Sequence, residues 1–137
     1  MSWDMWMTCF KEGEVATFSC EIAEAAFKPY IMERQGNDWV LNFPDDGSGQ
    51  VSVGYDEANR NLVNSLGFNR PSSSPYFWNA LIDILRQTDT VLYWAGEGAV
   101  VARESTIANL PESFIEAIGT PTVTTDIQEI HRMIEKA

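Results

Sequence analysis

Two stretches of this chain carry apolar side chains on both of their alternating faces, and they constrain the fold more than any other feature. One is residues 90–95, and the other is residues 2–10. The second stretch has two apolar sets that point to opposite sides: Trp3, Met5, Met7 and Cys9 on one, Trp6 and Phe10 on the other. A strand that is apolar on both sides is typical of the covered middle of a sheet. We therefore expect both stretches to be central strands.

An antiparallel hairpin is predicted in residues 38–55. Residues 38–43 and 51–55 both alternate, and the polar, glycine-containing segment 44–49 connects them. Such a pattern favours two paired strands with one apolar face and one small or polar face.

Two more strands are expected beside these. Residues 62–69 place Leu62, Leu66 and Phe68 on one face of a strand. Residues 99–102 follow the turn at 96–98 and are expected to pair with the central strand 90–95.

A first helix is predicted to begin after Ser19, whose hydroxyl suits an N-cap. Its inner face is expected to carry the following residues: Ile22, Ala25, Ala26 and Tyr30. Pro29 cannot donate a hydrogen bond to the carbonyl of Ala25. The helix therefore either ends near Phe27 or kinks there.

Two further helices have clear start signals. Serines at 72–74 precede Pro75, which predicts a helix from Pro75 to about Gln87 with a wide apolar arc. Near the end of the chain, Thr125 and Gln128 form a capping-box pattern before a helix at 126–136. The inner face of this last helix is expected to carry four residues: Ile127, Ile130, Met133 and Ile134.

The elements together predict one α+β domain over residues 1–137. Its sheet is mixed and mainly antiparallel, with about three helices in the order β-α-β-β-β-α-β-β-α. A short helical segment after Pro111, closed by Gly119, is expected within 104–119.

The net charge excludes several classes of partner. Twenty acidic residues against nine basic ones give a net charge of −11. Such a chain is not expected to bind nucleic acid or an anionic membrane through a basic patch. The apolar runs are too short for a membrane-spanning helix, and the first residues have no signal-peptide pattern, so a cytoplasmic protein is expected. Acidic charge also serves solubility, which is the alternative explanation for it.

No catalytic constellation, metal site or cofactor-binding motif is predicted. His131 is the one histidine, and Cys9 and Cys20 form neither a redox pair nor a disulfide framework. Glu112 and Glu116 share a helix face at a spacing that is typical of a solvated surface. We therefore expect that the protein is not an enzyme.

Acidic residues around the hairpin are the predicted partner-binding residues. They lie at its tip and base: Asp45, Asp46, Asp56 and Glu57. Between Gln35 and Asn59 there are five acidic residues and no basic one. Such charges can steer a basic partner, or they can protect a sheet edge from pairing with another chain. The sequence leaves both interpretations open.

Several short motifs resemble those of a group of small acidic bacterial proteins, which begin Met-Ser-Phe/Trp-Asp and soon reach Phe-x-x-Gly-Glu. The matching segments are Met1–Asp4, Phe10–Glu14, Ala26–Ile31, the region of Trp78, Val91–Trp94 and Leu110–Pro111. Similar proteins occur as immunity partners in bacterial polymorphic-toxin systems. The resemblance implies no catalytic or cofactor-binding residue.

The predicted function is therefore non-catalytic binding of a protein partner that has a basic surface. The resemblance implies that this partner is a bacterial toxin, which the chain would neutralise as an immunity protein. A regulatory or housekeeping interaction domain without a toxin partner is the first alternative. An enzyme with a site of carboxylates and aromatic rings is the second.

Overall fold

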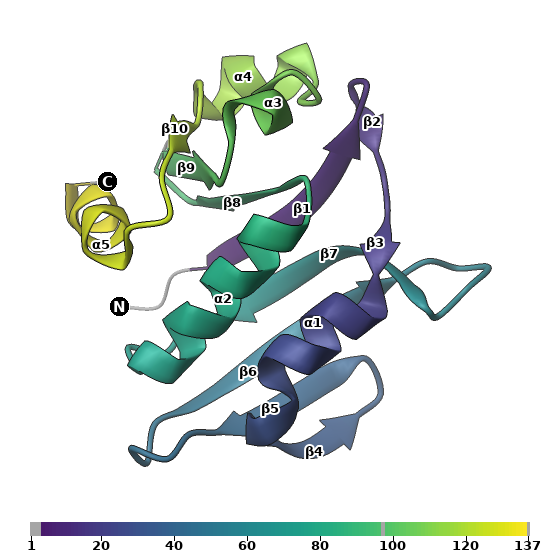
Figure 1. Cartoon of the computed structure of the whole chain (residues 1–137), viewed down its shortest axis with the longest axis vertical. Coiled ribbons are helices and arrows are strands. Elements are labelled where there is room, and N and C mark those ends of the chain that lie inside the picture. The colour runs from purple at the N-terminus through teal and green to yellow at the C-terminus, as the bar shows by residue number, and fades with distance from the viewer. Residues whose placement is uncertain (1–3, 97, 137) are drawn as a thin grey trace.

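One sheet forms the centre of the molecule, with helices packed against it (Figure 1). The computed structural model describes residues 4–96 and 98–136. Its strands are β1 (Asp4–Lys11), β2 (Glu14–Val15), β3 (Phe18–Ser19), β4 (Ile31–Gln35), β5 (Asp38–Asn42), β6 (Ser48–Tyr55), β7 (Leu62–Asn69), β8 (Thr90–Trp94), β9 (Gly98–Val101) and β10 (Thr122–Val123). Across the sheet they follow the order β10-β9-β8-β1-β7-β6-β5-β4, while β2 pairs with β1 and β3 pairs with β7. Trp3 lies outside the described residues.

The predicted α+β class is confirmed. Within the described residues, β9 and β10 form the one parallel pair and every other pairing is antiparallel. The helices are α1 (Cys20–Phe27), the 3-10 turn η1 (Lys28–Tyr30), α2 (Pro75–Gln87), α3 (Glu104–Ile107), α4 (Glu112–Ile118) and α5 (Ile127–Lys136). The chain therefore has more elements than predicted, because its two-residue strands and one-turn helices are too short to show a period and the five-residue strand β4 is mostly exposed.

Both predicted central strands lie in the middle of the sheet. β1 pairs with β7 on one side and with β8 on the other, and β8 continues to β9. Met5 and Met7 are fully buried on the face of β1 that the long helices cover. The turn after β1 is tight, with positive φ at Glu12 and Gly13.

Helix α2 provides much of the core on that face. It begins at Pro75 after Ser74, as predicted, and packs against α1. The expected serine cap is absent, because the Ser74 hydroxyl donates to Asp45 and makes no capping hydrogen bond. The Phe77 ring contacts the rings of Phe27, Phe43 and Phe68 at centroid distances of 5.4–6.2 Å. Aromatic side chains from α1, the β5–β6 connection, β7 and α2 thus meet in one cluster, which fixes both helices over the sheet.

Helix α1 starts as predicted and ends at the first of the two expected positions. The Ser19 hydroxyl accepts a hydrogen bond from the backbone N–H of Glu21, and the helix stops at Phe27 before Pro29. Its buried residues are Cys20, Ala23 and Phe27. These residues form the buried face of the helix, and Ala25 lies outside it and is exposed. The predicted inner face is therefore wrong for Ala25.

The predicted cap of the last helix is wrong. Asp126 Oδ1, and not Thr125, accepts hydrogen bonds from the backbone N–H groups of Gln128 and Glu129. A carboxylate is a strong acceptor for these N–H groups. Thr125 Oγ1 instead accepts a hydrogen bond from Arg86. The inner face of α5 is as predicted, with Ile130 fully buried.

A β-bulge explains a second error, in strand β7. Gly54 lies opposite Ser65 while Tyr55 lies opposite Val63, so Asn64 is an extra residue. The alternation shifts at this point, and Val63 is fully buried in place of Leu62, which is half-buried. The prediction for Leu62 assumed an unbroken alternation.

Helices α3 and α4 cover one end of the opposite face of the sheet. They close a second, smaller core with the following buried residues: Val91, Ala99, Val101, Leu110 and Phe114. Helix α4 ends at Gly119, whose φ of 102° suits glycine, as the sequence predicted. On β1 they reach Phe10, which meets Phe114 of α4 edge to face. The rest of this face, over the first part of β1 and over β7, β6, β5 and β4, has no helix of the described residues packed on it (Figure 1).

Among residues 4–96 and 98–136, no helix has both the length and the apolar character that are needed to cross a bilayer.

Candidate functional site

The four predicted acidic residues do not form one cluster. Asp45 and Asp46 follow β5, whereas Asp56 and Glu57 follow β6. The eight-residue strand β6 separates the two pairs, and at about 3.3 Å per residue its ends are roughly 25 Å apart. They thus lie at the tip and the base of the hairpin, as expected, but as two separate pairs, and their role in binding a partner stays a prediction.

Asp45 is also part of the structure of its turn and is not a free charge. Its Oδ1 accepts hydrogen bonds from the backbone N–H of Gly47 and from the hydroxyl of Ser74, each at 3.1 Å. Because Ser74 immediately precedes α2, the carboxylate lies near the positive end of that helix. Asp56 similarly accepts a hydrogen bond from the N–H of Ala58. Asp46 and Glu57 are exposed and remain available to a partner.

His131 and the two cysteines occupy packed positions. The His131 ring meets the Trp78 ring edge to face, with 4.6 Å between centroids. Burial is the main cause that raises the pKa of the Cys9 and Cys20 thiols above the ordinary value. A thiol in that state is a poor nucleophile at neutral pH. Among the described residues, no three His, Cys, Asp or Glu side chains gather as a metal site would require.

The uncovered part of the sheet is the more distinctive surface, and we call it the open face. The strand register places these residues on it: Asp4, Trp6, Glu33, Gln35, Asp38, Val40, Gln50, Ser52, Gly54, Ser65, Gly67 and Asn69. Most are small or polar. Three are acidic, and none of the residues in this set is Lys or Arg.

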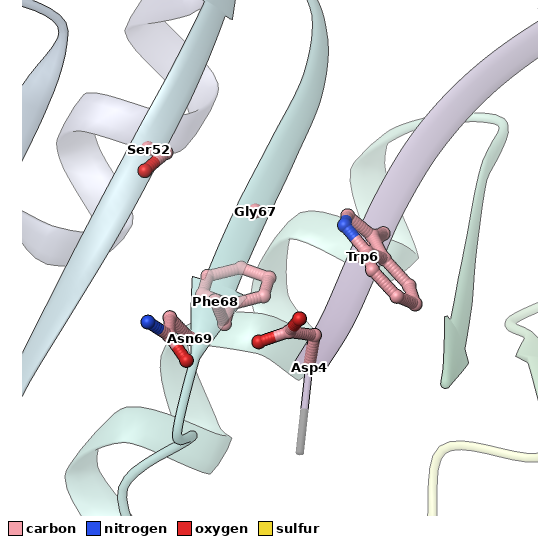
Figure 2. A pocket seen from close by; sticks show the side chains of 6 residues that line it. All are labelled: Asp4, Trp6, Ser52, Gly67, Phe68 and Asn69. Atoms are coloured by element: carbon pink, nitrogen blue, oxygen red, sulfur yellow. The ribbon is translucent and has the colours of Figure 1, made fainter. Parts of the chain in front are cut away.

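A hollow of about 240 Å³ lies in the open face between β1, β7 and β6. Its lining residues are Asp4, Trp6, Ser52, Gly67, Phe68 and Asn69. Figure 2 shows the Trp6 ring standing on β1, with the Asp4 carboxylate extending from the same strand toward Asn69 on β7. The hollow is smaller than the roughly 300–1,000 Å³ of sites that enclose a whole small molecule. Its size suits one protruding side chain.

Trp6 is held in place by an aromatic row from the second core. Tyr93 meets Phe114 edge to face at 5.2 Å, and Trp6 stacks on Tyr93 with 5.5 Å between ring centroids. The Tyr93 hydroxyl lies 3.2 Å from Thr8 Oγ1, which fixes the tyrosine. Trp6 ends the row and keeps 36% of its surface exposed. A large aromatic ring is thus presented to solvent in a fixed orientation.

Gly67 places no side chain of its own against the other face of the Trp6 ring. Tyr93 on β8 occupies one side of Trp6, and Gly67 on β7 is its neighbour on the other side. A Cβ added at Gly67 would lie 3.8 Å from both Ser52 Cβ and Trp6 Cδ1, which is an ordinary van der Waals distance. The space around position 67 would therefore accept a larger residue than glycine. The missing side chain creates the floor of the hollow.

The lining of the hollow combines hydrogen-bonding groups with one aromatic ring. Within the lining, Asp4 is the one carboxylate, whereas glycoside hydrolysis usually needs a pair of acids on either side of the bond. Asp4, Asn69 and Ser52 can accept hydrogen bonds, and the Trp6 ring offers a flat, electron-rich face.

The sequence places Trp6 on the second face of β1, but the prediction was that this face is covered. The sequence signal for the hollow is Gly67 within strand 62–69, because glycine inside a strand often marks the close approach of a ligand or of another backbone.

No protein-family model, no curated protein and no solved structure matches this chain.

Proposed function

We propose that this protein is a non-catalytic binding domain that presents the open face of its sheet to a protein partner with a basic surface. The observation that carries the proposal is the composition of that face. It combines an exposed, rigidly held tryptophan with three carboxylates, and the positions that the register assigns to it include neither Lys nor Arg.

The geometry supports an interface in two ways. Trp side chains are frequent among the few residues that dominate binding energy, especially in the middle of an interface with small neighbours. The surrounding Gly67, Ser52 and Gly54 leave the sheet low enough for a partner to approach Trp6 closely.

The overall charge supports a basic partner. A net charge of −11 attracts basic proteins over long range and speeds their association at low salt. In this proposal Asp46 and Glu57, exposed at the two ends of β6, contribute to that attraction from the periphery. Asp45 and Asp56 mainly stabilise their turns.

Bacterial toxins that act on nucleic acids often have basic clefts, whose charge is complementary to that of this surface. The resemblance to immunity proteins favours such a partner. A toxin domain encoded by an adjacent reading frame would support this part of the proposal. A regulatory partner would use the same surface.

Affinity capture with three baits tests the proposal. The wild-type protein is compared with Ser52→Arg, which adds a large cation in the open face, and with Ala25→Arg, which adds the same charge at an exposed position of α1. We expect a basic protein to be retained by the wild type and by Ala25→Arg, to be lost from Ser52→Arg, and to elute as salt is raised. Equal retention by all three baits would contradict the proposal.

A further inference from the structure

We propose that the hollow beside Trp6 receives one arginine side chain of the partner. This inference rests on the proposed function, because it names the group that a basic partner would insert. The hollow offers a free aromatic face, a carboxylate and two further hydrogen-bond acceptors around a floor without a side chain.

The free face of Trp6 is the first part of the argument. Tyr93 stacks on one face of the indole at an interplanar angle of 30°, and the opposite face looks toward Gly67. A guanidinium is planar and stacks on indole more readily than an ammonium does. Any larger residue at position 67 would occupy the space that the guanidinium needs.

The polar groups at the edge of the hollow are the second part. Asp4 lies two residues from Trp6 on the same side of β1, opposite Asn69. A guanidinium flat against the indole directs its N–H groups outward in its own plane. From there they can donate to the Asp4 carboxylate, to the Asn69 side-chain oxygen and to the Ser52 hydroxyl. Carboxylate and guanidinium form the strongest hydrogen-bonded pairs in proteins.

The chain already holds two of its own arginines in this manner. Arg34 lies 5.4 Å from the centre of the Trp39 ring and forms an ion pair with Glu24. The Arg60 guanidinium lies 4.0 Å from the centre of the Tyr55 ring and donates to Asn37. The first of these combines an indole with a carboxylate, as Trp6 and Asp4 do. The hollow therefore has the components of an arginine site but no arginine of the described residues in its lining.

Charge and size favour arginine over other occupants. Asp38 and Glu33 lie on the same face, so a cation is attracted more strongly than a neutral sugar that could also stack on Trp6. The hollow accommodates a side chain and not a whole cofactor.

The probe compounds are N-acetyl-arginine-N-methylamide, N-acetyl-lysine-N-methylamide and methyl glucoside, each added to the isotopically labelled full chain. Binding is followed at the indole N–H signal of Trp6, which is assigned by its loss in Trp6→Phe. We expect the arginine compound to bind with a dissociation constant on the order of millimolar. It should bind at least about fivefold more tightly than the lysine compound.

Four variants locate the site. Trp6→Ala, followed at the backbone amide signals of Gly67 and Asn69, and Asp4→Asn should each weaken arginine binding about fivefold or more. Gly67→Val should abolish it by filling the floor. Asp38→Asn removes the same charge from the same face outside the hollow, and it should leave the preference for arginine unchanged. Urea denaturation of each variant confirms that it is folded.

Four results would overturn the inference: equal binding of the arginine and lysine compounds, equal weakening by Asp4→Asn and Asp38→Asn, binding of the glucoside alone, or no shift with any compound. These experiments need no partner, so their failure is distinct from the failure of the capture experiment with Ser52→Arg.

Discussion

The two faces of the sheet differ in what covers them. On one face α1, α2 and α5 bury a continuous apolar core that includes the Phe77 cluster. On the other face α3 and α4 cover only the end near β8 and β9, and the aromatic row stops at Trp6. One face is therefore committed to stability, while the other keeps a large aromatic side chain in solvent. The difference teaches that an apolar residue in a central strand need not belong to the core.

The same tryptophan-to-alanine change on the two faces gives the largest predicted contrast. Trp78 is 3% exposed and its indole N–H donates to the Ser72 carbonyl, so Trp78→Ala should lower the free energy of unfolding by about 3–5 kcal/mol. Trp6 is 36% exposed, and Trp6→Ala should cost about 1–2 kcal/mol. Urea denaturation measures both. Equal losses would show that the two faces contribute alike to stability.

Two glycines test the same contrast between the two faces by adding a methyl group instead of removing a side chain. A Cβ at Gly98 would lie 2.1 Å from the Trp94 ring, so Gly98→Ala should cost about 1–3 kcal/mol by overpacking. A Cβ at Gly67 meets its nearest atoms at 3.8 Å, so Gly67→Ala should change stability by no more than about 0.5 kcal/mol. Thermal and urea unfolding of both variants would check this. A larger loss for Gly67→Ala would mean that the hollow is part of the folded core.

Acidic residues separate in the same way into structural and free charges. Asp45 bonds to Ser74 and to the N–H of Gly47, so Asp45→Ala should lower the unfolding free energy by about 1 kcal/mol. Asp46 has a positive φ that asparagine tolerates, and Asp46→Asn should be neutral within about 0.5 kcal/mol. Urea denaturation of the two variants measures these losses. An equal loss of unfolding free energy for both changes would show that Asp45 does not stabilise its turn.

The smallest effect concerns the two buried thiols of the covered face. Burial raises the pKa of Cys9 and of Cys20, so in the unfolded chain these groups ionise at a lower pH than in the folded protein. The free energy of unfolding should therefore be unaffected by them well below pH 9 and should fall as the pH rises above it. Urea titrations at neutral and alkaline pH, compared with Cys20→Ala, measure this loss. The alkaline loss should be smaller in the variant, and an identical loss would contradict the assignment for Cys20.

The fold could be predicted where a helix or strand is long enough to repeat its pattern of apolar residues several times. Residues 75–87 have a start signal and a full apolar arc, and β1 and β8 are apolar on both sides. Strand β4 was missed because four of its five residues are exposed, as at a sheet edge protected by charge. Contacts between distant residues, such as that of Asp45 with Ser74, leave no local pattern.

The candidate site was less predictable for a related reason. The sequence places Trp6 on the second face of β1, but whether that face is covered depends on how far α3 and α4 reach. They reach Phe10 and Tyr93 and leave Trp6 partly exposed. The predicted acidic residues were found by their proximity in the chain, whereas Asn69 and Ser52 reach the side of Asp4 and Trp6 only through strand pairing.

The central claim is that the open face, and not the acidic turn or the helical side, contacts the partner. Site-specific photo-crosslinking in the captured complex tests it most directly, with the photoreactive residue placed at Gln50 on the open face, at Asp46 in the turn after β5, or at Ala25 on α1. All three positions are exposed. We predict efficient crosslinking from Gln50, weak crosslinking from Asp46 and none from Ala25. Crosslinking that is strongest from Asp46 or Ala25 would contradict the account.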